Sequence, residues 1–247
     1  MNKNGQQTAF EVTRAQEKTG QINAGLRAYL LRVYQLMGLG LLFSAATAFL
    51  GTTPFFMSLL FNVTSQGIQY SVLGWLVIIA PLILVFMFGS AIRQGNSAKA
   101  QTLFWVFSGL MGFSFTTILL VFTPASLFQT FIIASGSFGA LCLYGYTTKR
   151  DLTSMGAFMQ MGLWGLIISM IVNFFMQSPT IAYGISILGV AIFVGLTAFD
   201  SQKIKMIYSD GDSKEMVNAK AVSGALTLYL DFINLFLMLI QLNGNRR

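Results

Sequence analysis

Two aspartates stand within or against long apolar stretches of this 247-residue sequence. Asp231 is embedded in Leu-Tyr-Leu-Asp-Phe-Ile-Asn-Leu-Phe, and Asp200 closes the run Val-Gly-Leu-Thr-Ala-Phe-Asp. The other acidic residues lie in polar segments. An ionisable group inside a membrane span is energetically costly, and it is by default a hypothesis about function. These two carboxyl groups are therefore the first candidates for chemistry.

If the two side chains meet, they form a proton-sharing pair. Two carboxylates in a low-dielectric environment cannot both ionise cheaply, so one proton is expected to remain between them. Asp200 and Asp231 would then be a pH sensor and gate, hydrogen-bonded when protonated and repelling when both are ionised. The ionised oxygens would suit a hard cation, so the same pair is the predicted transient Ca²⁺ ligand. Thr227 and Asn234, one helical turn to either side of Asp231, are predicted to add a polar pore lining.

Each of these residues also has a purely structural interpretation. Asp200 could end its helix in water and pair with Lys203 one turn on. Asp231 could make a single structural hydrogen bond. Arg93, which ends an earlier apolar stretch, is either a counter-charge for the aspartates or only a marker of the cytoplasmic side.

Membrane-spanning helices must position these residues. Of the residues, 55% are hydrophobic and 9% are charged, whereas soluble domains carry roughly 25% charged residues. The apolar blocks are long enough to cross a hydrocarbon core of about 30 Å. The sequence therefore predicts an all-α polytopic membrane protein with seven transmembrane helices, at Tyr29–Leu50, Val72–Ser90, Thr102–Phe122, Gln129–Tyr146, Ala157–Met176, Ala182–Phe199 and Ser223–Ile240.

The basic residues predict how these helices are oriented. All of the 15 lysines and arginines except Arg246 and Arg247 fall in the N-terminal segment or near the second, fourth and sixth connections. By the positive-inside rule, the N-terminus is expected in the cytoplasm and the C-terminus outside. Residues 1–24 are then a polar cytoplasmic tail, and residues 25–247 form the membrane domain. The lipid bilayer is the first partner that this organisation requires.

Composition also excludes several kinds of site. There is no histidine, which removes the commonest metal ligand and general base. Cys142 is the single cysteine, so no disulfide can form within the chain. The basic residues flank apolar spans and form no basic face with interleaved aromatics, which argues against nucleic-acid binding. Neither aspartate has the Gly-x-Gly-Asp context of intramembrane aspartyl proteases, so we expect no enzyme activity and no permanently bound cofactor.

Three motifs carry a specific resemblance to a known family. They are Tyr-Gly-Tyr-Thr-Thr-Lys-Arg-Asp-Leu at 144–152, Gly-Leu-Thr-Ala-Phe-Asp-Ser-Gln-Lys at 195–203, and Gly-Ala-Leu-Thr-Leu-Tyr-Leu-Asp-Phe-Ile-Asn-Leu-Phe-Leu at 224–237. They resemble the Bax inhibitor-1 family, also called the transmembrane Bax inhibitor motif family, and above all its bacterial members. The resemblance extends from about Gly25 to Arg247.

This resemblance implies a bacterial inner-membrane protein with its seventh helix central and surrounded by the other six. It further implies a pH-sensitive calcium leak with Asp200 and Asp231 as the sensor, and Ca²⁺ as a permeant or transiently bound ion. Arg93 looks like the second-span arginine that restrains the closed state in that family. Bacterial relatives also look like substrates or modulators of a membrane-anchored quality-control protease. The alternative function is therefore that of an interaction partner of such a protease complex, through residues 1–24 and the bundle surface.

Overall fold

Seven helices long and apolar enough to cross a membrane form a bundle. The computed structural model describes residues 3–64 and 67–247, with side chains described from Ala24 onward except at 63–68. The helices are α1 (Lys3–Gly51), α2 (Pro54–Leu60), α3 (Val72–Arg93), α4 (Ser97–Ser114), α5 (Thr116–Val121), α6 (Pro124–Thr147), α7 (Thr153–Met176), α8 (Pro179–Met206) and α9 (Lys214–Asn243). The spanning segments among the described residues are Ala24–Gly51, Val72–Arg93, Ser97–Val121, Pro124–Thr147, Thr153–Met176, Pro179–Met206 and Lys214–Asn243. The predicted seven-helix fold is confirmed, and α4 and α5 together form the third span.

Prolines and hydroxyl side chains begin several of these helices. Pro124 and Pro179 occupy the first turn of α6 and α8, where the missing proline N–H would have no helical partner in any case. The preceding residues, Thr123 and Ser178, accept hydrogen bonds from backbone N–H groups of the first turn. Pro81 lies inside α3, which nevertheless continues as one helix to Arg93.

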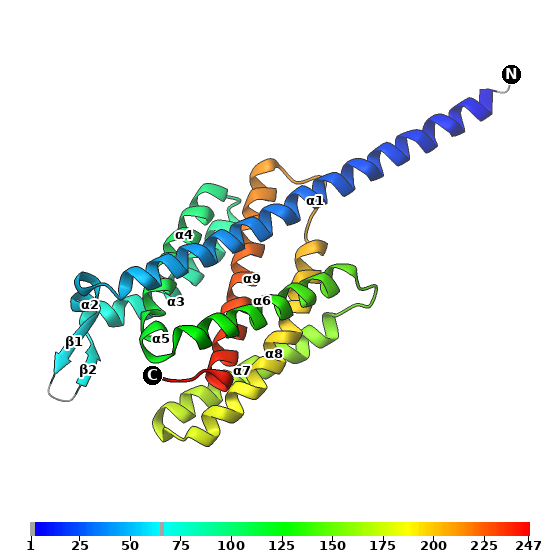
Figure 1. Ribbon diagram of the computed structural model, residues 1–247. Helices are drawn as coiled ribbons and strands as arrows, with labels where there is room; N and C mark the ends of the chain where they lie inside the picture. The colour runs from blue at the N-terminus through cyan, green and yellow to red at the C-terminus, as the bar shows by residue number, and fades with distance from the viewer. Residues whose placement is uncertain (1–2, 65–66) are drawn as a thin grey trace.

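Helix α9 is the central element of the bundle. It packs against α1, α3, α4, α6 and α8, and Figure 1 shows it running behind α1 and α6, which cross it. In its apolar stretch 56% of the residues are buried, against 11% in α7. Helix α7 packs mainly on α8 and reaches α9 through a small cluster that includes Leu166 and Met238. The seventh spanning helix is therefore central, with the fifth at the periphery.

Two features at one end of the bundle were not predicted from the sequence. An antiparallel hairpin, β1 (Phe61–Thr64) and β2 (Gly67–Tyr70), connects α2 to α3 and projects from the bundle in Figure 1. The C-terminal residues lie beside the start of α6, where the Arg247 N–H donates to the Val121 carbonyl and the Thr123 N–H donates to the Asn245 carbonyl. The C-terminus and the third connection therefore share one end of the molecule.

Candidate functional site

The two aspartates lie further inside their helices than the sequence predicted. Asp200 does not end its helix, because α8 continues to Met206 and keeps Ser201 and Ile204 buried against its neighbours. Asp231 comes eight residues after Ser223, where the predicted seventh span begins. It lies about 25 Å from the start of α9 at 1.5 Å per residue, because α9 begins at Lys214, where the Ser213 hydroxyl caps its first turn.

The side chains of Asp200 and Asp231 meet where α8 packs on α9. Their exposed fractions are 9% and 6%, and the two carboxyl groups are close enough to interact. A carboxylate has no proton to donate, so a hydrogen bond between two carboxyl groups requires one of them to be protonated. Among the described residues, the Oδ2 atom of Asp231 is buried and has no hydrogen-bond partner. The geometry is that of a carboxyl pair with one acceptor oxygen left unused.

Lys203 does not form the solvated ion pair that was the structural alternative for Asp200. Its charge acts on Asp200 from a distance, but the ammonium group is exposed and lies 5.7 Å from the centre of the Phe199 ring. Within the part of the chain that the structure describes, Lys220 and Asp212 form an ion pair, and Lys203 and Asp200 do not. Asp200 is thus a buried group whose closest acidic neighbour is Asp231.

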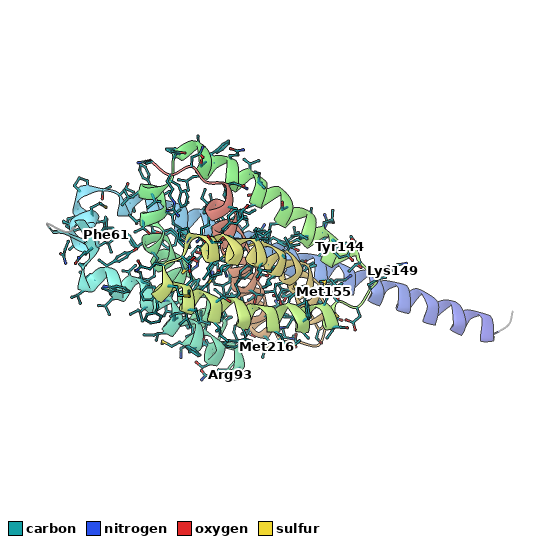
Figure 2. The ribbon with its side chains drawn as sticks, turned by 90° about the horizontal axis from the view of Figure 1, so that it is seen from below. Phe61, Arg93, Tyr144, Lys149, Met155 and Met216 are labelled. Carbon is teal, nitrogen blue, oxygen red and sulfur yellow. The ribbon has the colours of Figure 1, made fainter. Side chains whose placement is uncertain are left out.

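The structure does not bring Arg93 to the aspartates. Arg93 lies in the last turn of α3 and is exposed, and Figure 2 shows it at the edge of the bundle near Met216. It forms no ion pair with either aspartate among the described residues. Without such an ion pair, its predicted role as a counter-charge has no support in this arrangement.

The two predicted lining residues lie on α9 near Asp231 and are half-buried. The Thr227 hydroxyl donates to the Ser223 carbonyl one turn back, at 3.1 Å, so its proton is already used within the helix. Asn234 lies on the other side of Asp231 along the helix, where its amide is the polar group of that turn. Together with Asp231 they place polar side chains within the apolar segment of α9.

Three residues beside the pair were not singled out from the sequence. The Ser201 hydroxyl donates to the Cys142 carbonyl at 2.9 Å, and the Tyr34 hydroxyl lies 3.3 Å from Ser201 Oγ. The Cys142 side chain is also an electrostatic neighbour of Asp231. These contacts join α1, α6 and α8 next to the aspartates. Tyr34 and Cys142 lie in apolar spans, where such side chains usually belong to the packed core. For Ser201, one indication of a role at the site was available in the sequence, since it directly follows Asp200.

The first two sequence motifs meet at the end of the bundle where α6 and α8 end, called the basic end below because lysines and arginines gather there. Gln202 Oε1 accepts the Leu152 N–H at 2.9 Å, and Gln202 Nε2 donates to the Arg150 carbonyl at 2.8 Å. The connection between α6 and α7, marked in Figure 2 by Lys149 and Met155, is thereby held against α8. Within it, hydrogen bonds from the Thr153 hydroxyl and backbone N–H hold the pKa of the Asp151 carboxyl below its usual value.

The pair offers a limited set of ligands to a cation. Calcium takes six to eight oxygen ligands in proteins, and no group of three acidic or cysteine side chains gathers within the described residues. Asp200 and Asp231 can therefore supply two carboxylates, and water or backbone oxygens would have to complete the shell.

Comparison with known proteins places the whole membrane domain in one group. The family model described as "Inhibitor of apoptosis-promoting Bax1" matches residues 26–247. The inner membrane protein YbhL of Escherichia coli (strain K12) is 41% identical over 92% of this chain and 95% of its own length. A protein of Rickettsia prowazekii (strain Madrid E) is 41% identical over 93% of this chain and 94% of its own, and YrjE of Lactococcus lactis is 37% identical over 91% and 93%.

Proposed function

Because the chain belongs to the Bax inhibitor-1 family of membrane proteins, we propose that it is a pH-sensitive cation leak, with Ca²⁺ as the permeant ion. The gate is the pair Asp200 and Asp231. The observation that carries the proposal is their burial against each other at the contact of α8 and α9. The proposal assigns the protein no catalytic residue and no permanently bound cofactor.

A shared proton explains how such a pair controls a path for ions. With one proton present, the hydrogen bond holds α8 against α9. When it leaves, unit charges about 4 Å apart repel by about 4 kcal/mol at an effective dielectric constant of about 20. Such an energy is enough to reverse a two-state equilibrium by about a thousandfold. The separated carboxylates would then offer oxygen ligands to a passing cation.

The test is calcium influx into liposomes that contain the protein and a trapped calcium dye. Wild-type flux is expected to change steeply between about pH 6 and about pH 8, since a shared proton is lost over a narrow range. The Asp200→Asn and Asp231→Asn variants are each expected to lose this dependence. Flux equal to that of protein-free liposomes at every pH would contradict the proposed leak, whatever the result for the variants.

The proposal also assigns the protein an orientation in the membrane. The relative YbhL is an inner membrane protein by name, and we place this chain in the bacterial inner membrane with the basic end of the bundle in the cytoplasm. That end holds the α3–α4 turn and the α6–α7 and α8–α9 connections, and most of the basic residues outside α1 lie in them or in the adjoining ends of their helices. The N-terminus then lies inside and the C-terminus outside.

A second candidate function is that of a partner, modulator or substrate of a membrane-anchored quality-control protease. It is favoured by the shape of α1, whose N-terminal part extends beyond the bundle in Figure 1 and would be accessible to another protein. Removal of residues 1–24 distinguishes the two candidates. Such a truncated protein is expected to keep its wild-type leak in liposomes, whereas a protease partner would no longer be retained with it on affinity purification. Loss of the leak on truncation would count against the gate proposed here.

A further inference from the structure

Two separate hollows lie on the outside of the bundle between α1 and α6. Both helices pack on α9 and make few direct contacts with each other. The hollow toward the basic end, called the groove below, is a cavity of about 350 Å³ lined by residues that include Arg27, Leu30, Tyr34, Gly139 and Cys142. Toward the other end a second cavity of about 220 Å³ lies between Ala48 of α1 and Leu127 of α6, with Phe232 of α9 in its lining.

The lining of the larger cavity is apolar along its length and basic at its mouth. Its rim residues Leu31 and Leu143 are 51% and 62% exposed, on the surface that a bundle of spanning helices presents to lipid. Arg27 lies at the mouth, is exposed, and forms no ion pair within the part of the chain that the structure describes. A cation at the membrane surface above an apolar slot complements a molecule with an anionic head and a hydrocarbon tail.

We propose that this groove binds one anionic phospholipid, with its phosphate at Arg27 and one acyl chain along Leu30, Gly139 and Cys142. A partner helix is about 10 Å across with its side chains, which is too wide for a cavity of this volume. A zwitterionic phospholipid would fill the apolar part equally well but would carry no net charge for Arg27 to attract. Charge at the mouth therefore selects the anionic lipid.

The position of the groove connects the lipid to the aspartates. Tyr34 and Cys142 line the cavity, and both contact Ser201, the neighbour of Asp200. A bound acyl chain would lie against these two side chains and support the contact between α6 and α8. Lipid binding does not require ion conduction, so a failure of the proposed leak would not contradict the proposed lipid site.

Glycines of α6 provide a matched pair of variants for the test. A Cβ added at Gly139 or at Gly136, one turn earlier, would meet no atom within 4 Å, so both sites accept a larger side chain. Only Gly139 lines the cavity. Gly139→Leu should fill the groove, and Gly136→Leu is its control. Arg27→Gln removes the charge at the mouth, and Arg32→Gln, also exposed on α1 but outside the cavity lining, is its control.

The measurement is native mass spectrometry of the detergent-purified full-length protein, titrated with phosphatidylglycerol, phosphatidylethanolamine or oleate. The wild type is expected to retain one phosphatidylglycerol in preference to the other two. Gly139→Leu should bind it at least tenfold more weakly, and Arg27→Gln should bind both phospholipids alike, with both controls at the wild-type level. Wild-type retention by Gly139→Leu, or stronger binding of oleate than of phosphatidylglycerol, would overturn the proposal.

Discussion

Asparagine at position 231 is expected to remove the pH dependence of the protein's thermal stability. In the proposed gate, a hydrogen bond between Asp200 and Asp231 needs a shared proton, so the wild type is expected to be more stable at low pH and to lose stability as rising pH removes that proton. The amide of asparagine donates to Asp200 at every pH, so the variant should be stable throughout. At the alkaline end the difference should reach a few kcal/mol, the order of the roughly 3–5 kcal/mol that an uncompensated buried charge costs.

Thermal unfolding in detergent micelles from about pH 5 to about pH 9 measures this effect without any ion flux. Asp210→Asn is the matched control, because Asp210 is exposed in the connection between α8 and α9 and its removal should leave the wild-type slope intact. If Asp231→Asn keeps the wild-type slope, the pair does not share a proton. If the slope disappears while the liposomes show no leak, the pair shares a proton but does not gate a channel.

Alanine at Gly145 is expected to destabilise the protein by about 1–3 kcal/mol, the usual cost of overpacking. A Cβ at Gly145 would overlap the backbone carbonyl of Ala198 and lie 3.0 Å from the Ser201 Cβ. Neither atom belongs to a flexible side-chain end, so α6 and α8 would have to move apart beside the aspartates. The higher helix propensity of alanine, worth about 1 kcal/mol over glycine, offsets only part of this cost.

Gly136, which also lies in α6, provides the control variant for Gly145. Gly136→Ala adds a Cβ in open space, so this variant should unfold at the wild-type temperature or slightly above it. A loss of about 1 kcal/mol corresponds to a shift of roughly 2–4 °C in the unfolding midpoint for a chain of this size. Equal midpoints for the two alanine variants would show that α6 and α8 are not in the close contact described here.

Hydropathy was sufficient to predict the seven spans, but not where the helices end. The segments from Lys214 to Lys220 and from Gln202 to Met206 are polar, and a reading based on apolar length assigned them to connections. They are helical because capping and packing continue beyond the apolar block, as the Ser213 cap and the buried Ile204 show. The hairpin between α2 and α3 was missed for a related reason, since each of its strands has only four residues.

The aspartate pair was predictable because acidic residues inside apolar stretches are rare enough to stand out. The position of Arg93 relative to the aspartates was not predictable, because the sequence places Arg93 at a helix end without showing which other helix that end faces. Tyr34 and Cys142 were missed because side chains of their kind also fill apolar cores. Their relation to Ser201 depends on how α1 and α6 cross α8, which no local pattern records.

The backbone bonds at the C-terminus restrict how the central helix can move. Asn245 and Arg247 are tied to Thr123 and Val121 at the start of α6, and the Asn245 N–H also donates to Ser126 Oγ at 3.0 Å. Sliding α9 along its axis would break these bonds, each worth about 0.5–1.5 kcal/mol. Tilting α9 about that end would keep them. If the proposed gate opens by separating Asp231 from Asp200, these bonds favour a tilt of α9 about its C-terminal end over a sliding motion.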